Sequence, residues 1–353
     1  MRLRGSNEFA LRTASFAVAV GLAVLLTVIA VFNTKAAASG WLVGFVFCAQ
    51  ILVGSLTLVM IHRLTGGRWR QIIAPAIEPA SAAVPVLILF AVPLFVSIPA
   101  LYPWLHRPAA IKPDVLSYYL NVPSFIVRSV LALVGWSALA LLLPRVDGRR
   151  GQLFAALGLV FLALAISSVS VDWYLSLAAP FTSSSFGASV AISSLVAALA
   201  WAALVAPPCG DDPSIGDVGG LLLATILGIT YIDFMAVLVI WYGDLPYEET
   251  WFVERDFMPW TALAIAAFVL VSLGPILALL LARVRNAQVP LRVVGGCVLA
   301  GLACYDSYLI APPAGAPALV AASVAVVAVV LTLLGLLTGD AAPVSSRESA
   351  DAR

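Results

Sequence analysis

The sequence is poor in charged residues. Of its 353 residues, 10% are Asp, Glu, Lys or Arg, whereas 62% are hydrophobic and the mean hydropathy is +1.06. Soluble domains carry roughly 25% charged residues, so this composition excludes a soluble globular protein. It also excludes a disordered chain and a nucleic-acid-binding protein, because both are rich in charge. The remaining class is a protein embedded in a lipid bilayer.

Histidine and cysteine are scarce as well. The four cysteines are isolated and form no C-x-x-C or C-x-x-C-H motif, which excludes iron–sulfur and c-type haem sites. A secreted disulfide scaffold would need many more cysteines. The two histidines, His62 and His106, are expected on opposite sides of the membrane, so they could not hold a b-type haem between them. The sequence therefore predicts no metal centre.

Long apolar runs dominate what is present. A membrane-spanning helix needs about 20 mostly apolar residues, and the chain contains ten such runs. They are apolar all round, whereas the strands of a membrane β-barrel alternate apolar and polar residues. The sequence predicts an all-α polytopic membrane protein with a single transmembrane domain and a short cytoplasmic tail at 338–353. The expected spans are 13–32, 41–61, 82–101, 123–143, 152–171, 186–206, 219–241, 259–282, 293–311 and 318–337.

The distribution of basic residues predicts the orientation of the chain. Loops on the cytoplasmic side of a membrane protein carry an excess of Lys and Arg. With ten spans, 14 basic residues fall on the side of the two termini, four fall on the other side and Arg128 lies inside a span. Both termini are therefore expected to be cytoplasmic. The four basic residues on the outer side are Lys35, Arg107, Lys112 and Arg255.

Four charged residues lie in or at the ends of spans. Arg128, Asp233 and Asp306 are inside spans and Asp172 ends one, and all four are expected within about 12 Å of the outer end of a helix. Intramembrane charges are rare and commonly functional, and carboxylates can accept protons from a substrate hydroxyl. We therefore predict an outer polar cavity for proton release, quinol binding or ion passage. In the structural alternative, Arg128 snorkels or pairs with one aspartate, and the others cap backbone or bind water.

Two further polar residues lie near the middle of spans. Gln50 and Tyr231 are candidate quinone contacts, and the alternative is that each forms an interhelical hydrogen bond. The Gly40-x-x-x-Gly44 motif is typical of closely packed membrane helices.

Three stretches together resemble a known family. They are His62-Arg63-Leu64-Thr65-Gly66-Gly67-Arg68-Trp69, Asp172-Trp173-x-x-Ser176-Leu177 and Trp241-Tyr242-x-x-Leu245-Pro246-x-Glu248-Glu249-Thr250-Trp251. In combination they resemble the ActF-type, quinone-binding membrane subunits of alternative complex III, a bacterial quinol:electron-acceptor oxidoreductase. The resemblance extends over about residues 40–285.

The resemblance implies a fold, a location and a function. The fold would be two four-helix bundles, spans two to five and six to nine, flanked by spans one and ten. The protein would lie in the bacterial inner membrane, beside other respiratory-chain subunits that carry iron–sulfur clusters and haems. Without a redox centre of its own, it would contribute to quinol binding, proton release or conduction, or anchoring of those subunits. No covalent cofactor is implied, and the implied ligand is a quinone or quinol.

Two other functions remain open on the sequence. The protein could be a purely structural membrane anchor, in which the polar residues only hold helices together. It could also be a secondary transporter, because ten spans and buried acids permit that function. Many transporters contain an inverted internal repeat, and none is evident in this sequence.

Overall fold

The computed structural model describes residues 2–106, 113–178, 181–208 and 214–337. Within these ranges, nine helices are long and apolar enough to cross a membrane, and a bent helix pair could form a tenth span. The same ranges contain no β-strand. The predicted class, an all-α polytopic membrane protein, is therefore confirmed. The expected tail at 338–353 lies outside the described residues.

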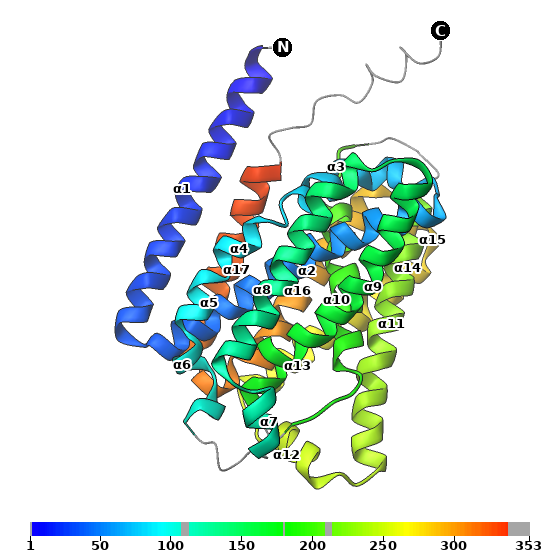
Figure 1. Cartoon of the computed structure of the whole chain (residues 1–353). Helices are drawn as coiled ribbons and strands as arrows, with labels where there is room; N and C mark the ends of the chain where they lie inside the picture. Colours follow the sequence, from blue (N-terminus) through cyan, green and yellow to red (C-terminus); the bar gives the residue numbers. More distant parts are fainter. Residues whose placement is uncertain (1, 107–112, 179–180, 209–213, 338–353) are drawn as a thin grey trace.

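The long helices run roughly side by side along the molecule (Figure 1). Nine of the ten expected spans each correspond to one helix or, for the eighth, to one nearly continuous helical segment, although several helices extend beyond the expected ends, α1 by 11 residues at its start. These elements are α1 (Arg2–Phe32), α2 (Thr34–Thr65), α8 (Val122–Leu142), α9 (Gly148–Trp173), α10 (Phe186–Val205), α11 (Ser214–Tyr242), α13 (Trp260–Phe268) with the π-helical turn η5 (Val269–Leu273) and α14 (Gly274–Leu280), α16 (Gln288–Ile310) and α17 (Pro317–Leu337).

The third span differs from the prediction. It was expected at 82–101, whereas helical structure begins at α3 (Trp69–Ala82) and bends by 53° before continuing. Proline lacks an N–H donor and clashes with the preceding turn, so the prolines of this segment divide it into short helices. Residues 69–81 were predicted as loop because the polar side chains of α3 interrupt the apolar run. The pieces after the bend are α4 (Val86–Phe90), α5 (Val92–Val96) and α6 (Ile98–Leu101).

The helices form two groups that meet at the centre of the molecule. In the first group, α2 packs against α3 and α9, and α9 packs against α8. In the second group, α10 packs against α11 and α16, while α13 lies on α16 and α14 lies on α11. The contact between α2 and α10 joins the groups, α17 packs on α2, and α1 packs on α17. This arrangement agrees with two four-helix bundles flanked by the first and last spans.

Glycines allow α2 to approach its neighbours closely. A Cβ atom on Gly40 would lie 2.4 Å from the Cβ of Ala321 on α17, and one on Gly44 would lie 2.8 Å from that of Ala325. The predicted packing role of Gly40-x-x-x-Gly44 is thus confirmed. Further along α2, a Cβ on Gly54 would lie 1.8 Å from the backbone oxygen of Ser194 on α10. Glycine at 54 therefore sets the spacing between the two bundles.

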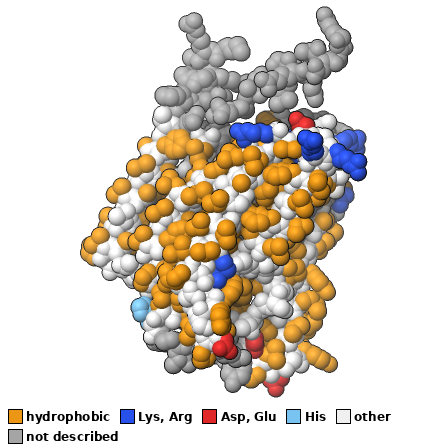
Figure 2. Space-filling view, viewed as in Figure 1, with side chains coloured by type: hydrophobic (Ala, Val, Ile, Leu, Met, Phe, Trp, Pro, Cys, Tyr) orange, Lys and Arg blue, Asp and Glu red, His pale blue; other side chains and the backbone are white. Residues whose placement is uncertain are grey.

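The charged side chains divide the molecule into two ends. Figure 2 shows Lys and Arg gathered mainly at one end of the visible face and acidic residues mainly at the other, with an apolar band between them. We call these the basic end, where α2 finishes and α9 begins, and the acidic end, where α11 is followed by α12 (Pro246–Val253). The start of α1 and the end of α17 lie at the basic end (Figure 1).

Candidate functional site

Arg128 and Asp172 form an ion pair between α8 and α9. The Arg128 guanidinium donates from Nε to Oδ2 of Asp172 at 2.8 Å and from Nη2 to Oδ1 at 2.7 Å. Nη2 also donates to the backbone oxygen of Tyr119, and the guanidinium carbon lies 3.8 Å from the centre of the Tyr119 ring. Asp172 is fully buried, whereas 19% of the Arg128 side chain is exposed. The pairing of Arg128 with an aspartate, left open by the sequence, is the arrangement observed.

Asp306 lies between the two bundles. Its carboxylate accepts hydrogen bonds from Nε2 of Gln50 at 2.9 and 3.2 Å, and from the hydroxyl of Tyr174 at 3.3 Å. Asp306 is fully buried and Gln50 nearly so. The Gln50 amide also donates to the Tyr174 hydroxyl at 3.2 Å. Gln50 is therefore an interhelical hydrogen-bond partner that joins α2 to α16.

Asp233, on α11, borders a cavity. Its Oδ1 accepts a hydrogen bond from the Ser189 hydroxyl of α10 at 2.7 Å, and the Tyr305 hydroxyl of α16 is a second partner of the carboxylate. These three residues line a cavity of about 580 Å³, which we call the Asp233 cavity. Drug-sized ligands occupy cavities of roughly 300–1,000 Å³, so this volume suits a small organic molecule.

The walls of the Asp233 cavity are mainly apolar, and eight of the lining residues are aromatic. Trp251 of α12 stacks on Phe181, with ring centres 4.7 Å apart, and its ring meets the edge of Tyr308 at 5.7 Å. Ser272, in the π-helical turn η5, accepts a hydrogen bond from Thr230 at 2.8 Å. Single π-helical turns are frequent at functional sites. The aromatic residues of the lining are Phe181, Phe186, Phe234, Trp251, Phe252, Phe268, Tyr305 and Tyr308.

A buried arginine supports one wall of this cavity. The Arg255 guanidinium carbon lies 3.8 Å from the centre of the Trp251 ring, and Nη1 donates to the Trp251 backbone oxygen at 2.8 Å. Burial disfavours the charged form and lowers the pKa of Arg255 to about 10. It remains a cation at neutral pH and fixes Trp251 by a cation–π contact. Sequence reasoning missed this role, because Arg255 was expected in a solvated outer loop.

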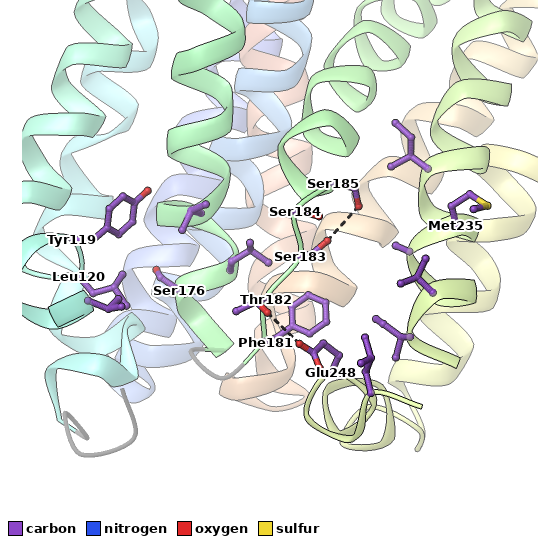
Figure 3. A pocket seen from close by; sticks show the side chains of 18 of the residues that line it. Tyr119, Leu120, Ser176, Phe181, Thr182, Ser183, Ser184, Ser185, Met235 and Glu248 are labelled. Atoms are coloured by element: carbon purple, nitrogen blue, oxygen red, sulfur yellow. Dashed lines mark hydrogen bonds between the residues drawn. The ribbon is translucent and has the colours of Figure 1, made fainter. Parts of the chain in front are cut away.

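A second cavity, of about 860 Å³, lies beside the first at the acidic end. The two cavities share Phe181, Ser183, Ser185 and Ala236 in their linings. Figure 3 shows this second cavity, with the Ser183 and Ser185 hydroxyls 3.3 Å apart and the Thr182 hydroxyl donating to Glu248 at 3.2 Å. We call it the Glu248 cavity.

Tyr231 lines the Glu248 cavity rather than the Asp233 cavity. Its side chain is 64% exposed, and no hydrogen bond orients it toward Asp233 within the described residues. Gln50 lines neither of these two cavities, so the two predicted quinone contacts do not share a large cavity.

The four predicted charged residues do not form one polar cavity. Arg128 and Asp172 pair with each other, Asp306 pairs with Gln50 and Tyr174, and Asp233 alone borders the aromatic cavity. Similar depth along the helices could not reveal this separation, because depth does not specify which helix faces which neighbour. Asp233 is the candidate with both a carboxylate and space for a ligand.

No protein-family model matches the chain, and no curated protein matches it significantly. Within the described ranges, no three His, Cys, Asp or Glu side chains lie together as a metal site would require. The Asp233 cavity is therefore the feature from which a function can be inferred.

Proposed function

We propose that this protein is an integral membrane subunit of a quinol-oxidising respiratory complex and that the Asp233 cavity receives the ring of the quinol. One observation carries the proposal: a hydrogen-bonded carboxylate lies at the wall of an aromatic cavity within a membrane protein. The resemblance to alternative-complex-III subunits supports it, since Trp251 and Glu248 belong to the third resembling stretch.

The chemistry of the cavity suits a quinol. A flat aromatic ring packs against the rings of Phe181 and Trp251, and one of its hydroxyls donates a hydrogen bond to Asp233. Phe234 and Val237 line the cavity and are 61% and 48% exposed on the apolar surface. The cavity therefore has an edge that faces lipid, where the apolar tail of the quinol would extend.

Oxidation of the quinol removes two electrons and two protons. Asp233 acts as the base that accepts the hydroxyl protons one after the other. An iron–sulfur or haem centre of a partner subunit would take up the two electrons. Each proton leaves past Ser183 and Ser185, which line both cavities, toward Glu248 at the acidic end. Ser189 and Tyr305 hold the Asp233 carboxylate in place during this transfer.

The charges at the two ends of the molecule favour one orientation in the membrane. In the bacterial inner membrane, the basic end would face the cytoplasm and the acidic end the outer side. The protons of the quinol would then be released on the outer side of that membrane. The ion pair Arg128–Asp172 and the hydrogen bond between Gln50 and Asp306 favour a second, structural role for the rest of the polar interior, because each joins two helices.

Purification of a tagged chain from native membranes in mild detergent tests the proposal. We expect co-purifying subunits, identified by mass spectrometry, and a reduced-minus-oxidised spectrum of haems. A short-chain quinone should also quench tryptophan fluorescence of the isolated chain in nanodiscs, less so after Trp251→Phe. Co-purifying redox subunits without fluorescence quenching by the quinone would favour a purely structural membrane anchor. A solitary chain without a redox spectrum or quenching would contradict the proposal and favour a transporter.

A further inference from the structure

A small cavity lies between the first bundle and α10, and it shares no lining residue with the two large cavities. Its volume is about 20 Å³, and its walls come from α2, α8, α9 and α10 together with Tyr174 just after α9. Most of its lining is apolar, but five side chains carry polar groups. These are Gln50, Trp136, Trp173, Tyr174 and Ser194, and Trp173 already donates to the Ser129 hydroxyl at 3.0 Å.

Two buried polar atoms of this lining have no hydrogen-bond partner among the described residues. They are the carbonyl oxygen Oε1 of Gln50, an acceptor, and the indole nitrogen Nε1 of Trp136, a donor. Both residues are almost completely buried. Leaving one buried polar group unpaired costs about 1–3 kcal/mol. Because two unpaired groups line the same cavity, we expect a partner that both of them share. A molecule that both accepts and donates would satisfy them together.

We propose that this cavity binds one water molecule, which accepts a hydrogen bond from the Trp136 indole and donates one to Gln50 Oε1. A water molecule needs a cavity of about 10–15 Å³ or more and two to four polar partners, and this cavity meets both conditions. The water donates its second hydrogen to the hydroxyl oxygen of Ser194. That hydroxyl donates its own proton to the Val190 backbone oxygen, which leaves its lone pairs free.

The water has a structural consequence for Asp306. Gln50 donates from Nε2 to both Asp306 and Tyr174, so its carbonyl oxygen must point elsewhere. The water fixes that carbonyl and thereby keeps the amide nitrogen on the Asp306 carboxylate. The site thus connects α8 to the junction between the two bundles. It is independent of the quinol proposal, because none of the residues that bind the water lines the Asp233 cavity.

Solid-state NMR on the full chain in lipid bilayers, labelled with ¹⁵N-tryptophan, tests this water site. Magnetisation should pass from water protons to the Trp136 indole N–H, and the corresponding signal should vanish in Trp136→Phe. Trp201 is the matched control, since its indole nitrogen is also buried and has no partner in the part of the chain that the structure describes, but Trp201 does not line this cavity. We expect transfer to Trp136 at least several-fold stronger than to Trp201. Equal transfer, or none to Trp136, would overturn the proposal.

Filling the cavity provides a second test. Ala49 lines the cavity, and Ala49→Val would occupy the space that the water needs. Transfer to the Trp136 indole should then be lost, whereas Ala163→Val, at an exposed position of α9, should leave it unchanged. A folded Ala49→Val protein that retains the signal would contradict the site. If Ala49→Val does not fold, the comparison of Trp136 with Trp201 in the unmodified chain decides the question.

Discussion

The side-chain amide of Gln50 donates a hydrogen bond of 2.9 Å to the carboxylate of Asp306, across 256 positions of the sequence. The two residues lie on α2 and α16, so the bond joins the two helix bundles. Neither residue lines the Asp233 cavity. A buried carboxylate can thus serve to connect helices, and its presence in a membrane span does not by itself mark a site of chemistry.

Gln50→Leu should destabilise the protein. Removal of the amide leaves the fully buried Asp306 with the Tyr174 hydroxyl as its one remaining side-chain partner within the described ranges, at a cost of about 1–3 kcal/mol. The thermal denaturation midpoint in detergent measures this loss. The double variant Gln50→Leu/Asp306→Leu should be more stable than Gln50→Leu alone, because it leaves no unpaired carboxylate. Gln152→Leu, at an exposed position, serves as the control. A double variant less stable than either single one would contradict this reading of the pair.

Replacement of Arg128 should destabilise the protein more than replacement of Asp172. Arg128→Gln leaves the completely buried Asp172 charge uncompensated, which costs about 3–5 kcal/mol. Asp172→Asn should cost less, because the partly exposed Arg128 can extend toward water. Denaturation midpoints of the two variants test this order. If Asp172→Asn proved the more damaging change, Asp172 would have a role beyond the ion pair.

The sequence predicts much of this fold and less of the site. Apolar runs predict ten spans, and nine of them correspond to long apolar helices within the described residues, because length and hydropathy decide whether a helix can cross a bilayer. The bent third span was misplaced, since the charges of α3 interrupt its apolar run. The sequence also did not predict that Asp233, Asp172 and Asp306 lie in three different surroundings. It depends on helix rotation and on which helices are neighbours, and neither follows from depth in the membrane.

Asp233→Asn should abolish most quinol oxidation by the assembled complex while leaving quinone binding intact. Asparagine keeps the shape and the hydrogen bond from Ser189 but cannot accept a proton, and loss of a general base typically costs about 10²–10⁴-fold in rate. Turnover with a quinol analogue and fluorescence quenching by the quinone separate the two effects. Asp217→Asn, at an exposed position of the same helix, is the control. Wild-type turnover in Asp233→Asn would remove Asp233 from the mechanism.

Gly54→Ala should be among the most damaging single-methyl changes in the protein. The added Cβ would lie 1.8 Å from the Ser194 backbone oxygen, so α2 and α10 would have to separate where the bundles meet. Overpacking of this kind typically costs about 1–3 kcal/mol, and here a backbone atom rather than a flexible side chain must move. Gly21→Ala on α1 is the matched control, since its Cβ would meet nothing within 4 Å. There alanine should stabilise the helix by roughly 0.5–1 kcal/mol, because glycine loses more backbone entropy on folding. Opposite shifts of the two denaturation midpoints are therefore expected, and a neutral Gly54→Ala would mean that the bundles can part without loss of packing.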